Sequence, residues 1–166
     1  RAYIATPTCS PSRSSVVTGQ HPARLRIVRH IPGGTQYGFD KFGRTNEHWH
    51  VLETDPAQFP SRNWLPLEVT TIAEALKPLG YYSAFMGKWH LGSEPWHPIR
   101  QGFDEQRGVS NFGHPRHYYQ PFFVEGANPY ADTPEGKYLT DRLADDAMDF
   151  LTNYRRKEPF LLTVFF

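Results

Sequence analysis

Helix-like segments followed directly by short apolar segments constrain the fold of this chain more than any other feature. A capping box, Thr71-Ile72-Ala73-Glu74, opens a predicted helix over residues 71–79, and Gly80 ends it. A second, amphipathic helix is predicted over about 138–155. Residues 81–86 and 160–166, one segment after each helix, have the composition of buried strands. The pattern predicts an α/β fold whose mostly parallel sheet is covered by helices on both faces.

Each of these helices has one apolar side, which we expect to pack on the sheet. In the first helix that side consists of Ile72, Ala75, Leu76 and Leu79. In the second it consists of Leu139, Leu143, Ala147, Phe150, Leu151 and Tyr154, and the opposite side consists of Asp141, Arg142, Asp145 and Asp146. The spacing therefore predicts which residues are buried as well as where the helices lie.

A third, short helix is predicted over about 11–18, with Ser10 as its N-cap, Pro11 in the first helical position and Gly19 just past its end. Cys9 would then lie at the helix entrance. Two long segments, 20–66 and 93–135, are interrupted by Pro and Gly and are predicted to be irregular. Long loops of this kind commonly line binding sites.

The charge balance excludes several classes of protein. The chain has 18 Lys and Arg against 17 Asp and Glu, a net charge of +1, so it has no broad electrostatic footprint for nucleic acid or an anionic membrane. No segment approaches the ~20 consecutive apolar residues that span a bilayer. Cys9 is the single cysteine, which excludes an internal disulfide and a cysteine-rich zinc site.

Both ends of the chain look interrupted. The chain begins at Arg1 without a Met or a signal peptide, and it stops on the apolar run 160–166, which no turn or polar residue closes. Its 166 residues suit one ordinary domain or part of one. We therefore expect residues 1–166 to be an internal part of a larger domain, truncated at both ends.

Two motifs carry the chemistry. The first is Cys9-Ser10-Pro11-Ser12-Arg13, followed by a short helix to Thr18-Gly19, and the second is Gly80-Tyr81 before a strand that ends in Gly87-Lys88-Trp89-His90-Leu91-Gly92. In this order they resemble the two signatures of the type I sulfatases. Gln101-Gly102-Phe103-Asp104 and Tyr138-Leu139-Thr140-Asp141 also resemble connecting segments of bacterial carbohydrate sulfatases. The resemblance implies an alkaline-phosphatase-like α/β fold, a place in the N-terminal catalytic domain, and removal of sulfate from a carbohydrate or aryl ester.

The first motif suits an anion independently of the resemblance, because a helix entrance offers unpaired backbone N–H groups and the positive end of the dipole. The resemblance implies that a formylglycine-generating maturation enzyme oxidises Cys9. One hydroxyl of the hydrated aldehyde would then attack sulfur and displace the alcohol, and the second hydroxyl would expel sulfate and restore the aldehyde. Arg13, one turn further on, would organise that side chain. Lys88 would contact both the sulfate and the hydrated side chain, and His90 would hydrogen-bond to the latter. If strand geometry continues to residue 90, Lys88 and His90 point to one face and Trp89 to the other.

The resemblance also implies a divalent cation, calcium in most relatives, with position 9 as one ligand. The other ligands, the acid for the leaving alcohol and a further sulfate-binding lysine would lie outside residues 1–166, so the isolated fragment is expected to be catalytically incomplete. Position alone suggests a substrate contact for His114, with Asn111 nearby. Relatives further imply a sulfated small molecule or glycan as partner, and export to a periplasm, a secretory lumen or the cell exterior.

Alternatives stay open. A phosphonate or phosphodiester hydrolase of the same superfamily shares the Cys-x-Pro-x-Arg element, and a non-catalytic sulfatase-like domain would bind sulfated glycans without hydrolysing them. A tyrosine-phosphatase loop is excluded, because the position where it needs Arg is Ser15. Zinc binding by His48 with His50, or by His114 with His117, has little support, because neither pair has a cysteine or a well-spaced acidic partner.

Overall fold

The computed structural model describes residues 6–32, 49–51, 59–123 and 129–166. In these ranges the helices are α1 (Cys9–Thr18), α2 (Pro22–Leu25), α3 (Ile72–Leu76) and α4 (Leu139–Asn153). The strands are β1 (Trp49–His50), β2 (Ser61–Arg62), β3 (Tyr82–Lys88), β4 (Glu105–Ser110) and β5 (Phe160–Phe165). Short 3-10 helices are η1 (Lys77–Leu79), η2 (Glu94–Trp96) and η3 (Pro98–Gln101). No helix in this part of the chain is both long and apolar enough to cross a membrane.

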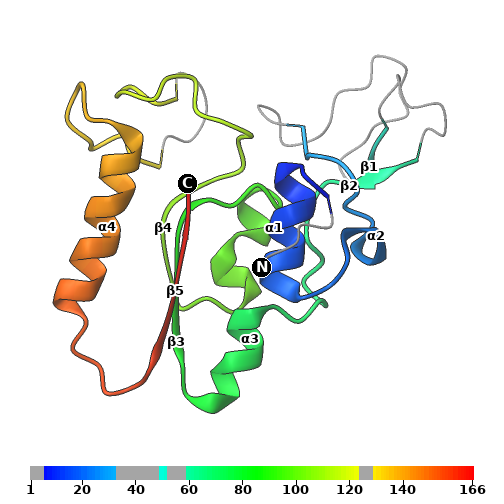
Figure 1. Cartoon of the computed structure of the whole chain (residues 1–166), viewed down its shortest axis with the longest axis horizontal. Coiled ribbons are helices and arrows are strands. Elements are labelled where there is room, and N and C mark those ends of the chain that lie inside the picture. Colours follow the sequence, from blue (N-terminus) through cyan, green and yellow to red (C-terminus); the bar gives the residue numbers. More distant parts are fainter. Residues whose placement is uncertain (1–5, 33–48, 52–58, 124–128) are drawn as a thin grey trace.

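A parallel sheet forms the centre of the described structure, with its three strands in the order β4-β3-β5 (Figure 1). In the central strand Ala84 pairs with Glu105 of β4 on one side and with Leu162 of β5 on the other. Parallel strands require crossover connections, and α4 lies in the connection from β4 to β5, which are on opposite sides of β3. The mostly parallel α/β arrangement predicted from the alternating helix and strand patterns is therefore confirmed.

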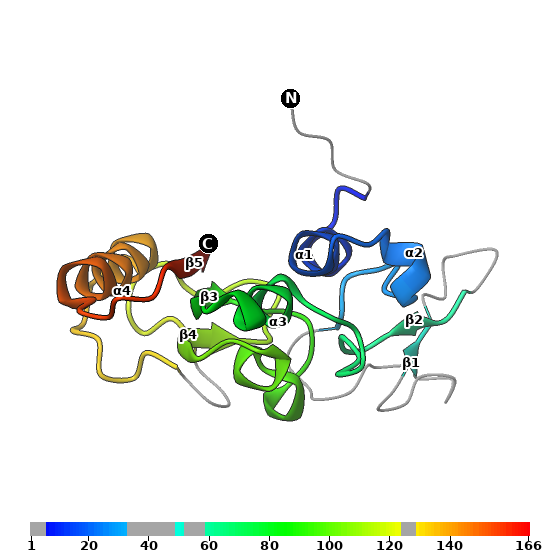
Figure 2. The same cartoon turned by 90° about the horizontal axis from the view of Figure 1, so that it is seen from below.

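Helices cover both faces of the sheet, as predicted (Figure 2). Successive side chains of a strand point to opposite faces. Phe85 is fully buried on the face that also contains Val17 of α1 and Ala73 of α3. Its neighbour Met86 is fully buried on the other face, against Phe150 of α4. The alternation along β3 thus creates two separate apolar layers.

The helix α4 matches its predicted span to within two residues, but its predicted sides need correction. Leu143 and Phe150 are buried as expected, whereas Leu151 is 48% exposed. Asp146, predicted to face solvent, is only 4% exposed. Its carboxylate accepts a hydrogen bond of 2.7 Å from the Tyr130 hydroxyl and forms an ion pair with Arg142. A loop that packs on the polar side of the helix therefore buries this carboxylate.

The predicted helix over 71–79 is present as α3 followed by η1, and Gly80 ends it with a left-handed φ of 80°. The capping box between Thr71 and Glu74 is confirmed. The predicted buried side is wrong, since Ile72 and Leu79 are exposed while Ala73 is fully buried. The Thr71 hydroxyl donates a 2.7 Å hydrogen bond to the Gln101 carbonyl. This contact holds the side of the helix that contains Thr71 and Ala73 toward the protein interior.

Strand β4 lies inside the segment 93–135, which was predicted to be irregular. Its sequence Glu105-Gln106-Arg107-Gly108-Val109-Ser110 is polar and contains a glycine, so it lacks the apolar run of a buried parallel strand. In the described sheet it has one strand neighbour and is half-buried along most of its length. Pairing with β3 makes it a strand, and that long-range partner cannot be read from local composition.

Candidate active site

Cys9 is the first residue of α1. This end of α1 lies on the same side of the molecule as the carboxyl end of β5 (Figure 1). Its side chain is half-buried and forms no disulfide. The prediction that Ser10 caps a helix beginning at Pro11 is wrong: Thr8 occupies the N-cap position and makes no side-chain capping bond. The Ser10 hydroxyl instead accepts a hydrogen bond of 3.0 Å from the Ile31 N–H. Gly19 ends the helix in the left-handed conformation, as predicted.

Arg13, one turn beyond Cys9, connects α1 to the ends of two strands. Its Nη1 donates 2.7 Å to the carbonyl of Lys88, and its Nη2 donates 3.1 Å to the carbonyl of Phe166. The guanidinium also lies 4.8 Å from the centre of the Phe165 ring. Burial lowers the pKa of Arg13 to about 10, while nearby Cys9 acts in the opposite direction, so the group stays cationic at neutral pH.

Lys88 is the last residue of β3, and its position depends on a local irregularity of that strand. Gly87 has a φ of 91°, and the register with β4 shifts between Met86 and Lys88. The Lys88 ammonium donates a hydrogen bond to the Gly113 carbonyl. Burial lowers the pKa of Lys88, Cys9 raises it and Arg13 lowers it. Cys9, Arg13 and Lys88 thus lie close enough to influence one another electrostatically.

His90 departs from the strand geometry on which its predicted orientation depended. Its φ is 55°, so the extended backbone does not continue from Lys88 to His90, and the predicted alternation of these side chains is wrong. The imidazole is fully buried, with Nε2 2.7 Å from the Ile31 carbonyl. Because a carbonyl only accepts, Nε2 carries the proton and Nδ1 is an acceptor. Among the described residues this buried Nδ1 has no hydrogen-bond partner.

Burial is the main reason that His90 is neutral. It lowers the pKa of His90 to about 3, and the charge of Lys88 acts in the same direction, against the hydrogen bond to Ile31. Gly113 packs directly against the ring, since a methyl group at Gly113 would lie 3.3 Å from its Cε1. The site therefore offers a neutral acceptor beside two cations, a combination suited to a hydroxyl donor on an anionic ligand.

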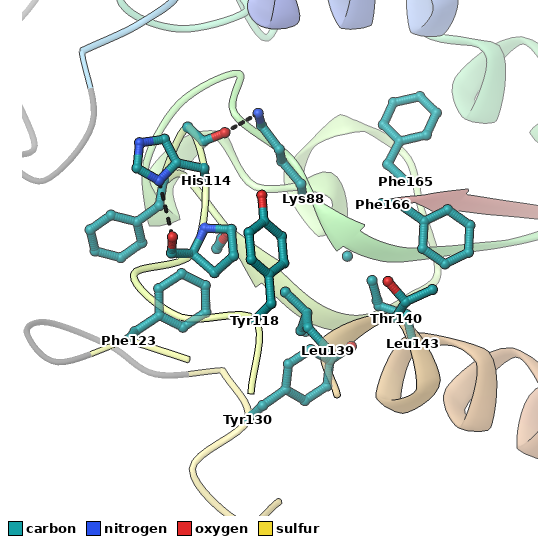
Figure 3. Close-up of a pocket in the computed structure, with 16 residues that line it drawn as sticks. Lys88, His114, Tyr118, Phe123, Tyr130, Leu139, Thr140, Leu143, Phe165 and Phe166 are labelled. Carbon is teal, nitrogen blue, oxygen red and sulfur yellow. Dashed lines mark hydrogen bonds between the residues drawn. The ribbon is translucent and has the colours of Figure 1, made fainter. Parts of the chain in front are cut away.

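A pocket opens beside Lys88 between the strand ends, the loop 112–123 and the first turns of α4 (Figure 3). His114, the weaker sequence candidate, is exposed and lines this pocket, with its Nδ1 3.0 Å from the Pro115 carbonyl. Asn111 accepts a hydrogen bond of 3.0 Å from the Gly92 N–H, which fixes the loop after the second motif. Asn111 thus has a structural contact within the chain.

Several residues of this region were missed from the sequence. The pocket walls include Phe112, Tyr118 and Phe123, which lie in the segment predicted only as an irregular loop. An aromatic cluster in a Pro-rich loop is a weak signal in a sequence, because such residues are equally common in ordinary packing. Only the fold brings them to the edge where Lys88 ends its strand.

The described residues do not by themselves form a metal centre. Within these ranges no group of three His, Cys, Asp or Glu side chains is arranged to hold a metal ion. The Nδ1 of His50 lies 2.6 Å from the Asn63 amide oxygen, and His48, the histidine considered with it for zinc, lies outside the described residues.

The described residues place the cysteine at the start of α1 and the basic strand-end residue Lys88 at the carboxyl edge of a parallel sheet, and this α/β arrangement has the alkaline-phosphatase-like fold. The family model described as Sulfatase matches residues 1–166. The chain belongs to the sulfatase family, a family that generally depends on formylglycine and a divalent cation.

Known relatives agree with this assignment. Human (Homo sapiens) N-acetylgalactosamine-6-sulfatase is 32% identical over 96% of this chain and 30% of its own length. The crystal structure of Ps i-CgsB is 25% identical, with a TM-score of 0.68 over 98% of this chain and 35% of that one. A structure in complex with its substrate D-glucosamine-2-N,6-O-disulfate is 27% identical, with a TM-score of 0.58 over 98% of this chain and 25% of that one. The chain thus spans about a third or less of the length of each of these relatives.

Proposed function

We propose that the protein containing this chain hydrolyses sulfate esters, with residue 9 as its nucleophile after conversion of Cys9 to formylglycine. The observation that carries the proposal is the position of Cys9 in the first turn of α1, within electrostatic reach of Arg13 and Lys88. The first turn of a helix generally has backbone N–H groups without intrahelical partners and lies at the positive end of the helix dipole, and both features favour an anion.

Formylglycine supplies a hydrated aldehyde, whose two hydroxyls allow attack on sulfur and later release of sulfate. The chain's own residues then have distinct roles. Lys88 places a positive charge beside residue 9, where it can attract the sulfate oxygens. The buried, unpaired Nδ1 of His90 is suited to accept a hydrogen bond from one hydroxyl at position 9. Arg13 holds the helix of residue 9 against the strand ends and adds a second cation.

The substrate class is proposed from the relatives, because human N-acetylgalactosamine-6-sulfatase and the complex with D-glucosamine-2-N,6-O-disulfate are both named for sulfated amino sugars. A sulfated carbohydrate is accordingly the first choice, and an aryl sulfate the second. A formylglycine-generating maturation enzyme is the proposed partner, since position 9 is encoded as cysteine. Export from the cytoplasm, and metal binding through position 9, are proposed from the same resemblance.

The test uses the full-length protein produced together with a formylglycine-generating enzyme. Mass spectrometry of the peptide around position 9 is expected to show formylglycine, and Cys9→Ala is expected to abolish sulfate release from N-acetylgalactosamine 6-sulfate and from an aryl sulfate. Turnover of a phosphate diester and a phosphonate in parallel distinguishes the related hydrolases. Sulfate release that survives Cys9→Ala would sink the proposed mechanism, and a matured protein that hydrolyses none of these esters would favour the binding-only alternative.

A further inference from the structure

Ser10 directly follows the proposed nucleophile and is fully buried in the first turn of α1. Its hydroxyl accepts a hydrogen bond of 3.0 Å from the Ile31 N–H, 21 positions further along the chain. Ser14 is also fully buried in α1, but its hydroxyl donates 2.7 Å to the Pro11 carbonyl within the same helix. Ser10 is therefore a side chain of α1 that fixes a segment outside the helix.

Ile31 connects Ser10 to the second motif through its main chain. Its N–H donates to Ser10, and its carbonyl accepts a hydrogen bond of 2.7 Å from Nε2 of His90. Pro32 follows Ile31 and disfavours helical backbone angles for it, which narrows the directions in which the N–H and the carbonyl can point. The residue after position 9 and the imidazole of the second motif are thus joined through one residue.

The hydrogen bond to Ile31 decides which nitrogen of His90 carries the proton. Nε2 faces a carbonyl, which only accepts, so the proton lies on Nε2. The buried Nδ1, which has no partner among the described residues, is left as an acceptor. Gly113 limits movement of the ring, since a methyl group there would lie 3.3 Å from Cε1. Among the described contacts, the tautomer of His90 depends on the Ile31 carbonyl alone.

The tautomer matters because the imidazole is neutral. Burial lowers the pKa of His90 to about 3, and the charge of Lys88 acts in the same direction. An imidazolium carries protons on both nitrogens and accepts no hydrogen bond, whereas the neutral ring has one acceptor nitrogen. A hydrogen bond from a hydroxyl at position 9 to Nδ1 therefore requires the tautomer with its proton on Nε2.

Burial of these three residues makes the Ser10 hydroxyl difficult to replace. Ser10 and His90 are fully buried, and Ile31 is only 2% exposed. Removing the hydroxyl would leave the Ile31 N–H without a partner in the interior, which is unfavourable enough to shift the segment that contains it. The Ile31 carbonyl would move with that N–H, and the hydrogen bond that fixes the His90 tautomer would weaken.

We propose that Ser10 is a positioning residue, which holds His90 in the tautomer protonated on Nε2 through the main chain of Ile31. The proposal rests on the proposed function and deepens it, because it names the group that makes Nδ1 of His90 an acceptor at position 9. Ser10 follows residue 9 in the same helix turn, so the nucleophile and the group that orients its hydrogen-bond acceptor are fixed together.

The first experiment observes the tautomer directly, by NMR of the full-length protein labelled with ¹⁵N-histidine. The His90 signals are assigned by their loss in His90→Gln. In the parent, His90 is expected to carry its proton on Nε2, and that proton should exchange slowly with water. Ser10→Ala should speed this exchange at least about tenfold. Ser14→Ala is the matched control, since it removes an equally buried hydroxyl from the same helix and should leave the His90 signals unchanged.

The second experiment measures turnover of an aryl sulfate by the matured full-length variants. Mass spectrometry gives the fraction of formylglycine at position 9, so that rates are compared per matured molecule. Ser10→Ala should lower kcat about tenfold. KM should change less than about twofold, because His90 is proposed to contact the nucleophile rather than the substrate. A merely structural role of Ser10 would not separate kcat from KM in this way.

Three results would overturn the proposal: a parent His90 protonated on Nδ1, a Ser10→Ala variant with the parent's tautomer and exchange rate, or equal effects of Ser10→Ala and Ser14→Ala. Ser10→Thr keeps a hydroxyl and should retain the parent's His90 signals, so it tests the proposal even where Ser10→Ala does not fold. A Ser10→Thr variant that behaves like Ser10→Ala also overturns it. A tautomer that depends on Ser10, in a protein that releases no sulfate, would reject the proposed function and support the positioning role.

Discussion

The Nη1 of Arg13 donates a hydrogen bond of 2.7 Å to the main-chain carbonyl of Lys88. This bond joins the helix that begins at Cys9 to the strand end that carries the second motif. The same guanidinium donates to the Phe166 carbonyl, so one planar group spans the ends of β3 and β5. The relative position of residue 9 and Lys88 therefore depends on a guanidinium that donates two hydrogen bonds in different directions. A lysine ammonium in its place cannot reproduce this geometry.

Arg13→Lys should lower kcat/KM for a sulfate ester at least about tenfold in the matured full-length protein, because a single ammonium cannot hold both carbonyls. Steady-state kinetics with an aryl sulfate measures the effect. Arg24→Lys is the control, since Arg24 is an exposed arginine of α2. Equal rates for Arg13→Lys and the parent would show that charge alone is needed at position 13.

His90 should make the protein sensitive to acid. Its pKa is lowered from 6.5 to about 3 by burial, so the unfolded chain binds a proton between these pH values and the folded chain does not. Stability contributed by the neutral imidazole is therefore present above pH 6.5 and is lost progressively as the pH falls toward 3. Melting temperatures measured across this range should fall less steeply in His90→Gln than in the parent.

The control for His90 is the same substitution at His117, an exposed residue of the loop 112–123. It should leave the slope of melting temperature against pH unchanged. Imidazole NMR signals offer a direct reading, in which His90 stays neutral far below pH 6. A His90 signal that titrates near the usual histidine pKa in the folded protein would contradict its burial as a neutral group.

Gly108→Ala should lower the free energy of unfolding by about 2–4 kcal/mol, through backbone strain and a steric clash. Gly108 has a φ of 59°, and a methyl group there would lie 1.9 Å from the Tyr130 hydroxyl oxygen. Gly136→Ala is a matched control, because Gly136 also has a left-handed φ, of 76°, but no described atom within 4 Å of its added methyl. Gly136→Ala should lower the free energy of unfolding only through backbone strain, by about 1–2 kcal/mol.

Chemical denaturation of the two glycine variants and the parent separates these contributions. The additional loss in free energy of unfolding of Gly108→Ala over Gly136→Ala measures how tightly Tyr130 packs on β4. Equal destabilisation by both substitutions would mean that Tyr130 moves aside freely.

The amino-acid sequence by itself determined the α/β class, the helices around 71–79 and 138–155, and the family. These conclusions depend on patterns within short segments: the capping box at Thr71, the amphipathic spacing of α4 and the two motifs. Local propensities and residue spacing carry such information because they act over neighbouring residues. The sequence also identified Cys9, Arg13, Lys88 and His90 as candidates, although their roles stay predictions.

The tertiary structure decided what depends on distant partners. Strand β4 exists because it pairs with β3, and Asp146 is buried because Tyr130 and Arg142 pack on it. His90 turns away from strand geometry to reach the Ile31 carbonyl, which lies 59 positions earlier in the chain. Burial, hydrogen-bond partners and pocket walls arise from contacts between segments far apart in sequence, and no local pattern encodes them.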